Sequence, residues 1–309
     1  MNDYSWQDLK ARIRTLSSPL VPRPTAQTPL VDPLPGIRAV LFDIYGTLVI
    51  SASGDIGLAG EQDQAGAFRS ALETAGIEVP LGIDADALKD AIRRFHAKRQ
   101  AAGVAFPEVD ILAMWREVLG GEENPVSASH LPGEAGDKKR SWRDDLIERL
   151  AIEYECRVNP VWPMPGLKQV LADLAQRGLV LGIVSNAQFY TPLMLEAFLG
   201  KTLATIGFDA ACCAYSYRLL EAKPSTRIYD QALSGLATVH GIAPGEVLYV
   251  GNDMRNDIWP AAELGCRTAL FAGEQRSLRL REDDPCCASV TPDRVVTDLR
   301  QITDSILQP

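Results

Sequence analysis

A short apolar segment that runs into an aspartate and a glycine turn constrains this chain most. Residues 39–48 read Ala-Val-Leu-Phe-Asp-Ile-Tyr-Gly-Thr-Leu, so Asp43 directly follows four apolar residues and precedes Gly46 and Thr47. A continuous apolar run is typical of a strand that is buried on both faces. We therefore expect the carboxylate of Asp43 at the open end of a buried strand, either as a covalent nucleophile or as a simple turn former.

Two further segments place polar side chains at the ends of apolar elements. Residues 179–184 form an apolar run, which predicts a buried parallel strand, and Ser185 and Asn186 follow it. Pro224 is well placed to open a helix. Lys223, just before it, could neutralise a charged nucleophile and the group transferred to it. Singly, both signals are weak, because Ser-Asn strand ends and Lys-Pro helix starts are common.

A fourth segment combines an apolar strand with an acidic turn. Residues 247–250 precede Gly251, after which come Asn252, Asp253 and Asp257. Hard cations such as Mg²⁺ prefer oxygen ligands from a few carboxylates and carbonyls, completed by water and substrate. This turn is therefore a candidate metal site.

In this order, the four segments resemble the signatures of the haloacid dehalogenase-like hydrolase superfamily. Its phosphatases read Asp-x-Asp-Gly-Thr in the first signature, with the first Asp as nucleophile and the second as general acid/base, whereas this chain has Tyr45 at the second position. The resemblance covers roughly residue 37 to the end of the chain. It implies an α/β fold with a Rossmann-like parallel sheet core and an inserted all-helical cap domain.

The resemblance also implies which residues form the site. The catalytic and substrate-binding residues would come from the first three segments: Asp43, Tyr45 and Lys223 for catalysis, and Thr47, Ser185 and Asn186 for the substrate. The Mg²⁺ ligands would come from the first and fourth segments: Asp43, the backbone carbonyl of Tyr45, Asn252 and Asp253, with Asp257 behind them. Members of the superfamily usually have Gly-Asp where this chain has Gly-Asn, so Asn252 takes a ligand position.

Two reactions compete for this site. The first is Mg²⁺-dependent hydrolysis of a small phosphorylated metabolite through an aspartyl-phosphate, and we favour it here. The phenol of Tyr45, with an ordinary pKa near ~10, is a poor base at neutral pH and predicts a slow phosphatase.

The second reaction is metal-independent 2-haloacid dehalogenation through an aspartyl ester. Haloacid dehalogenases carry Asp-x-Tyr-Gly-Thr, and expelling halide needs no proton. Against this reaction, Asp253 and Asp257 would place negative charge near an anionic substrate. A third interpretation is a non-catalytic ligand-binding protein on the same scaffold.

The predicted elements divide the chain into three parts. Residues 1–36 are a Pro-rich extension expected to pack on the surface or to be partly mobile. Residues 57–160 show helical periodicity, with Asp84 and Asp110 as helix N-caps and a loop over 120–139, and would form the cap. Alternating strands and helices predict the core. The core comprises residues 37–56 and 161–309.

Two groups of basic residues can be explained simply as solvated surface. The first lies on a predicted cap helix and could receive an anionic substrate tail, although a solvated helix face is the simpler interpretation. It comprises Arg93, Arg94, His96, Lys98 and Arg99. The second, Arg276, Arg279 and Arg281, follows the last predicted core strand, and we interpret it as solvated surface.

Composition limits the partners. The 309 residues carry a net charge of −9, which opposes attraction to nucleic acid or an anionic membrane, so we expect a small anionic substrate. No apolar run approaches the ~18 residues of a membrane span, and the opening residues lack the features of a secretory signal. We therefore expect a cytoplasmic protein whose six cysteines are reduced. Substrate identity and oligomeric state stay open.

Overall fold

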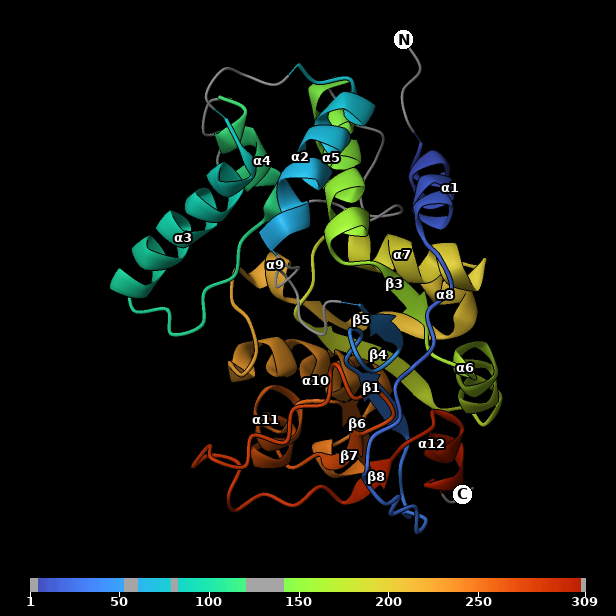
Figure 1. The fold of residues 1–309 in the computed structure, drawn as a ribbon. Helices are drawn as coiled ribbons and strands as arrows, with labels where there is room; N and C mark the ends of the chain where they lie inside the picture. The colour runs from blue at the N-terminus through green and yellow to red at the C-terminus, as the bar shows by residue number, and fades with distance from the viewer. Residues whose placement is uncertain (1–4, 53–60, 79–82, 121–141, 307–309) are drawn as a thin grey trace.

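Six parallel strands form the centre of the molecule (Figure 1). In the computed structural model, residues 5–52, 61–78, 83–120 and 142–306 are described. The strands lie in the order β5-β4-β1-β6-β7-β8, each parallel to its neighbours. Their bounds are Ala39–Phe42 (β1), Val180–Ser185 (β4), Phe208–Tyr215 (β5), Val247–Gly251 (β6), Arg267–Phe271 (β7) and Arg294–Val296 (β8). The strands that we predict near 179–184, 207–215, 246–250 and 267–271 correspond to β4, β5, β6 and β7 within about one residue at each end. β1 lies where we expected it, and β8 was not predicted.

Helices cover both faces of the sheet, which explains why its central strands are apolar throughout. Every residue of β1 is fully buried, and alternate side chains enter different clusters: Val40 and Phe42 pack on one face and Leu41 on the other. The helices outside the insertion are α1 (Trp6–Leu16), α6 (Leu167–Gln176), α7 (Tyr190–Leu199), α8 (Leu203–Ile206), α9 (Ser216–Leu219), α10 (Thr226–His240), α11 (Trp259–Glu263) and α12 (Arg300–Asp304). Two single turns are η1 (Pro244–Glu246) and the π-helix η2 (Met254–Ile258).

The segment inserted after β1 is all-helical within the described residues, as predicted. It contains α2 (Glu61–Ala75), α3 (Ala85–Ala101), α4 (Ile111–Val118) and α5 (Trp142–Val158). Asp84 and Asp110 are N-caps, since their carboxylates accept from Asp86 N at 3.0 Å and Leu112 N at 3.0 Å. The loop expected over 120–139 lies, apart from its first residue, outside the described residues.

A two-stranded antiparallel pair, which we did not predict, joins the insertion to the core. Strands β2 (Val49–Ser51) and β3 (Val161–Pro163) pair where the chain leaves for the helices and where it returns. A hydrogen bond of 2.9 Å from Ala52 N to Pro160 O continues this pairing. The insertion therefore departs and returns side by side, as expected for a cap (Figure 1). The residue bounds that we gave for the cap and the core stay a prediction.

Three aromatic rings tie the helices of the insertion together. Trp115 of α4 is fully buried, stacks on Phe68 of α2 at 5.8 Å and meets the edge of Tyr154 of α5 at 5.4 Å. These rings bury large apolar areas in favourable stacked and edge-to-face geometries. The insertion therefore has an apolar centre of its own.

The N-terminal extension is ordered along its described length. Leu9 and Ile13 of α1 are buried against α5 and α7. Residues 20–35 then follow the surface to the edge of the sheet formed by β8 (Figure 1), and we call these residues the strap. Thr25 Oγ1 in the strap donates to Ala272 O at 2.6 Å, and Leu30 forms a β-bridge with Val295. This segment packs on the surface, one of the two outcomes that we expected.

The described helices contain none that is long and apolar enough to cross a membrane. All six cysteines are free thiols, as expected.

Candidate active site

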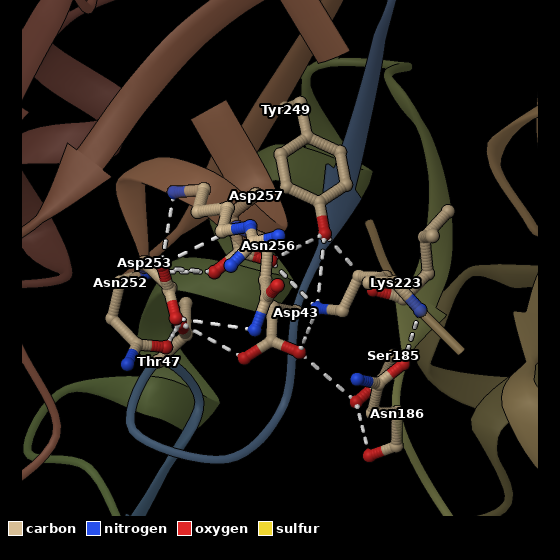
Figure 2. Close-up of polar contacts among 12 residues, drawn as sticks. Asp43, Thr47, Ser185, Asn186, Lys223, Tyr249, Asn252, Asp253, Asn256 and Asp257 are labelled. Atoms are coloured by element: carbon tan, nitrogen blue, oxygen red, sulfur yellow. Dashed lines mark hydrogen bonds and ion pairs between the residues drawn. The ribbon is translucent and has the colours of Figure 1, made fainter. Parts of the chain in front are cut away.

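Polar side chains from the ends of β1, β4 and β6 meet Lys223, from the loop between α9 and α10, at the carboxyl edge of the sheet (Figure 2). Asp43 follows β1 and Ser185 ends β4. Asp43 Oδ1 accepts hydrogen bonds from Ser185 Oγ at 3.0 Å and from Lys223 Nζ at 2.7 Å. In a parallel sheet, ligands bind at this edge. The structure brings Asp43, Ser185 and Lys223 together, as we predicted.

Lys223 lies buried between two carboxylates. Its Nζ is 2.7 Å from Asp43 Oδ1 and 2.6 Å from Asp257 Oδ1. Burial alone would lower the pKa of Lys223, but the charges of Asp257 and Asp43 raise it above its ordinary value, so the ammonium stays charged. Asn186, which we expected to bind substrate, accepts from the Lys223 backbone N–H through Oδ1 at 2.8 Å and thereby positions it.

Both oxygens of the Asp257 carboxylate accept hydrogen bonds. Besides Lys223, Tyr249 Oη donates to its Oδ1 at 3.0 Å, and the backbone N–H groups of Asn252 and Asp253 donate to Oδ2 at 3.0 and 2.9 Å. Burial raises the pKa of Asp257 to about 6, although the Lys223 ammonium lowers it. Gly251 makes room for this carboxylate, because a Cβ there would lie 2.3 Å from Asp257 Cγ.

Tyr45 takes no proton-transfer position. Its hydroxyl is 3.0 Å from Thr191 Oγ1. Burial, and next the nearby Glu155, raise the pKa of Tyr45 well above its ordinary value, so the phenol stays neutral. The site therefore lacks the second carboxylate of the phosphatase signature, and Tyr45 cannot act as a base in its place at neutral pH.

The turn after Asp43 is closely packed. Gly46 has a φ of +83°, and a Cβ there would lie 2.4 Å from Ser277 Cβ and 2.8 Å from Asn252 Nδ2. Thr47 is fully buried, and its Oγ1 donates to Asn252 Oδ1 at 3.0 Å and weakly, at 3.4 Å, to Asp43 Oδ2. Thr47 therefore supports the turn, whereas we expected it to bind substrate.

The acidic turn does not fit the predicted Mg²⁺ site. Asn252 is neutral, and its amide is used by Thr47 and by Ser277 O, to which Nδ2 donates at 2.6 Å. Asp253 accepts a bidentate pair from Arg281, with Nε at 3.1 Å and Nη2 at 2.7 Å, and also caps η2.

The carboxylate oxygens of the acidic turn are engaged as well. Those of Asp253 and Asp257 already have charged or backbone donors, which leaves Asp43 Oδ2, with its weak Thr47 contact, as the open one among the described residues. Mg²⁺ sites typically use one or two carboxylates together with substrate phosphate. The arrangement supplies a single available carboxylate oxygen and a cation, Lys223, beside it.

A cavity of about 70 Å³ opens onto these groups. This is well above the roughly 10–15 Å³ that a single water needs, so the cavity has room for water or for part of a small molecule. Seven of the predicted site residues line it: Asp43, Tyr45, Asn186, Lys223, Asn252, Asp253 and Asp257. The buried Ser185 and Thr47 reach Asp43 without appearing in this lining, and Asn256, Ser277 and Arg279, which we did not predict, complete it.

Our interpretation of the second basic group as solvated surface is wrong for all three members. The side chain of Arg276 is only 17% exposed and pairs with the buried Glu274. Arg281 pairs with Asp253, and Arg279 lines the cavity. Both follow β7, which lies next to β6, so their loop begins at the same edge of the sheet as Asp253. The position of these arginines after a core strand could have indicated a place at the site. The strand order, which puts β7 next to β6, was needed to recognise it.

The first basic group lies elsewhere. Arg93 pairs with Asp90 at 2.7 Å and Arg94 with Glu117 at 2.7 Å, both on the surface, and burial lowers the pKa of His96. None of the group is among the described residues that line the cavity. The simpler interpretation, a solvated helix face, describes Arg93 and Arg94.

Known proteins share sequence and fold with this chain. The phosphoglycolate phosphatase of Escherichia coli (strain K12) is 29% identical over 238 residues, covering 74% of this chain and 79% of that protein. The enzyme of that name from Salmonella choleraesuis (strain SC-B67) is 28% identical over 244 residues, covering 76% and 81%. A crystal structure of a 2-haloacid dehalogenase from Pseudomonas syringae pv. Tomato DC3000 aligns with a TM-score of 0.52 at 19% identity, covering 87% and 97%, which shows the fold alone.

A family model completes the comparison. The model of haloacid dehalogenase-like hydrolases matches residues 37–265, well over half of the chain. The match includes the strand ends that carry Asp43, Ser185 and Lys223. The chain therefore belongs to the haloacid dehalogenase-like hydrolases and is itself a hydrolase.

Proposed function

We propose that this hydrolase acts on a small 2-substituted carboxylic acid, with Asp43 as covalent nucleophile and without a divalent metal. One observation carries the proposal. Lys223 and Ser185 hold Asp43 through Oδ1, so Oδ2 is left to attack a ligand in the cavity. A positioned cation and hydroxyl orient the nucleophile, which is the role a metal would otherwise take.

The charges around Asp43 support an anionic substrate. The objection to a dehalogenase was the negative charge of Asp253 and Asp257. Arg281 balances the first of these at 2.7 Å and Lys223 the second at 2.6 Å. The repulsion that would oppose a 2-haloacid is therefore smaller than the sequence suggests.

The chemistry of the leaving group points the same way. Asp43 Oδ2 forms a bond to C2 of a 2-haloacid while halide leaves with the bonding pair, so no general acid is needed and the neutral Tyr45 does no harm. Water then attacks the ester carbonyl. It supplies oxygen to the regenerated carboxylate, and the 2-hydroxy acid and a proton are released.

The second candidate is the expected Mg²⁺-dependent phosphatase. The likeness to phosphoglycolate phosphatases at 29% identity favours it, and the donor set around Asp253 opposes it. The two candidates share one chemical feature. Both 2-haloacids and phosphoglycolate are short acids that carry their reacting substituent, a halogen or a phosphate group, on the carbon next to the carboxylate.

A substrate screen separates the candidates. The purified chain is incubated with 2-chloropropionate and with phosphoglycolate, each with Mg²⁺ and with EDTA. We expect halide release that EDTA does not change. Phosphate release that EDTA abolishes would reject the metal-free proposal in favour of the second candidate. Release of neither would favour the non-catalytic alternative.

A further inference from the structure

Strand β5 is irregular near its start, at the end of the sheet opposite the active site. Its pairing with β4 changes register between Leu181 and Ile183, so residues 209–212 of β5 form a bulge. Within the bulge, Asp209 Oδ1 accepts a hydrogen bond from Ala211 N at 2.9 Å, which fixes the local turn of the chain. Bulges redirect side chains and are common next to functional sites. We therefore asked which side chains this bulge brings together.

The bulge places two metal-ligating side chains on the same side of β5. In a regular strand, residues three positions apart point to opposite faces of the sheet. Asp209 and Cys212 are three positions apart, yet a carboxylate oxygen of the first and the sulfur of the second lie within 4.8 Å of each other. Asp209 is partly exposed and Cys212 is buried. The pair therefore joins the surface to the apolar interior.

A histidine at the end of α10 completes a cluster of three. His240 Nε2 lies 2.7 Å from Asp209 Oδ2, and a ring nitrogen, the carboxylate oxygen and the Cys212 sulfur all lie within 4.8 Å of one another. Helix α10 packs against β5 (Figure 1). The two elements approach closely at Gly235, where a Cβ would lie 2.0 Å from Ala211 O. Glycine at this contact therefore lets the helix bring His240 to the bulge.

Imidazole, thiolate and carboxylate are the ligands that Zn²⁺ takes in proteins. Bonds of about 2.0–2.3 Å at tetrahedral angles place the ligand atoms roughly 3.3–3.6 Å apart. The separation of 2.7 Å between His240 and Asp209 is shorter than this, and the upper limit of 4.8 Å for the cluster is longer. Both side chains are partly exposed, so small rotations about their side-chain bonds can bring all three ligand atoms to tetrahedral spacing.

The charge and the access of the cluster also suit a divalent ion. One thiolate and one carboxylate neutralise the two positive charges, so the half-buried site carries no net charge when it is filled. Asp209 and His240 line a surface groove of about 530 Å³, through which an ion can enter. Three protein ligands leave a fourth tetrahedral position for water.

From these observations we propose that Asp209, Cys212 and His240 bind Zn²⁺ or a similar borderline-soft divalent ion. The thiolate ligand favours Zn²⁺ over Mg²⁺. Binding releases the thiol proton of Cys212 to solvent, and the imidazole coordinates through Nε2 in the tautomer that carries its proton on Nδ1. The site lies at the opposite end of the sheet from Asp43, so the inference does not depend on the proposed function.

Cobalt(II) is a suitable probe for this site, because Zn²⁺ itself is spectroscopically silent. A cobalt–thiolate bond absorbs in the near ultraviolet, and tetrahedral Co²⁺ absorbs strongly in the visible. The full chain, without an affinity tag and with its thiols reduced, is freed of metal and titrated with Co²⁺ and then with Zn²⁺. We expect one equivalent of Co²⁺ to produce both absorptions and Zn²⁺ to abolish them. A parent protein that shows no thiolate absorption would overturn the inference.

Substitutions identify the ligands. We expect Cys212→Ser to remove the thiolate absorption, and His240→Gln and Asp209→Asn each to weaken Co²⁺ binding about tenfold or more, because even residues that only orient metal ligands are worth that much. Cys212 is fully buried, so Cys212→Ser could unfold the protein. His240→Gln, at the partly exposed end of α10, keeps the test decisive in that case. Undiminished Co²⁺ binding in His240→Gln would overturn the inference.

Matched controls are available for the cysteine and for the histidine. Cys266 is buried in the same apolar cluster as Cys212 but is not part of the group of three ligands, and His96 lies on α3. Cys266→Ser and His96→Gln should bind Co²⁺ like the parent, and circular dichroism checks that every variant is folded. Equal loss of the thiolate absorption in Cys266→Ser and Cys212→Ser would overturn the inference.

Thermal unfolding gives a second measurement that needs no substrate. An ion that binds the native state stabilises it, so Zn²⁺ should raise the Tm of the parent protein and raise that of His240→Gln less. An equal rise in both proteins would contradict coordination by His240. Since neither measurement involves turnover, failure of this inference leaves the proposed function standing, and the reverse also holds.

Discussion

At the scale of single residues, the site is organised around one carboxylate with one open oxygen. Lys223 and Ser185 donate hydrogen bonds to Oδ1 of Asp43, whereas Oδ2 has only a weak contact of 3.4 Å with Thr47 Oγ1. A nucleophile held in this way loses little orientational freedom when substrate binds. At this scale we therefore make predictions for Asp43 and for Asp257, which also pairs with Lys223.

Replacing the nucleophile should remove turnover and spare binding. We expect Asp43→Asn to lower kcat more than about 10³-fold because no covalent ester can form, while ligand affinity is retained. The measurement is halide or phosphate release beside calorimetric binding. Asp230→Asn, an exposed change on α10, serves as the control and should behave like the parent. Turnover at the parental rate in Asp43→Asn would exclude a covalent role for this side chain.

The pH dependence of activity should report on Asp257. Burial raises its pKa to about 6, so below that pH the carboxyl is protonated and no longer fixes Lys223. We expect kcat to rise with pH through about 6, and this step to be absent in Asp257→Asn. Initial rates between pH 5 and pH 8 test both enzymes. A step that persists unchanged in Asp257→Asn would assign it to another group.

The stability effect of Asp257 has the opposite sign. Its folded pKa of about 6 lies above the ordinary value of 3.8, so between these values the native state holds a proton that the unfolded state has released. The favourable contribution of Asp257 to the free energy of unfolding is therefore complete below pH 3.8 and is lost as pH rises through 6. Urea unfolding of the parent relative to Asp257→Asn should show this difference shrinking toward neutral pH.

At the scale of elements, the sequence predicts regular structure better than it predicts contacts between loops. Continuous apolar runs located the central strands, and capping residues located the starts of α3 and α4. The π-helix η2 was missed because a single extra residue in a turn leaves no periodic signal. The pair β2–β3 was missed because its strands have three residues each and lie over a hundred positions apart.

The aromatic centre of the helical insertion gives the prediction at this scale. Trp115 is fully buried between Phe68 and Tyr154, so Trp115→Ala should lower the free energy of unfolding by about 3–5 kcal/mol. Trp115→Phe should cost less, because a ring still stacks on Phe68 and an indole N–H without a partner among the described residues is removed. Urea unfolding followed by circular dichroism measures both, and equal losses would contradict the role of the ring.

At the scale of the whole molecule, residues distant in the sequence define the site. The order of the signature segments was enough to predict Asp43, Ser185 and Lys223 together, because carboxyl ends of parallel strands share one edge. Arg281 and Ser277 could not be assigned in that way. Their roles depend on a loop that folds back over the acidic turn, and its path is set by tertiary contacts that spacing does not encode.

The strap should influence the loop between β7 and β8 from outside the site. Glu274 is 1% exposed and accepts from the backbone of Arg23 at 3.2 Å and from Arg276 Nη2 at 2.7 Å. We expect Glu274→Gln to loosen this junction and raise KM severalfold with kcat within about twofold, since only recognition is disturbed. Steady-state kinetics test this change.

The control for this experiment is a surface pair of the same kind. Glu246→Gln removes a carboxylate that contacts Arg38 at 3.2 Å and should alter neither constant. A fall in kcat with unchanged KM in Glu274→Gln would show that the junction acts on the nucleophile instead.

The contacts of the strap also concern the order in which the chain is made. Arg276 Nη2 donates to Val21 O at 2.8 Å, a contact between residues 255 positions apart. On the ribosome the strap emerges early, whereas the loop between β7 and β8, which it contacts, is translated near the end. The side of the cavity that Ser277 and Arg279 line can therefore form only when synthesis of the chain is almost complete.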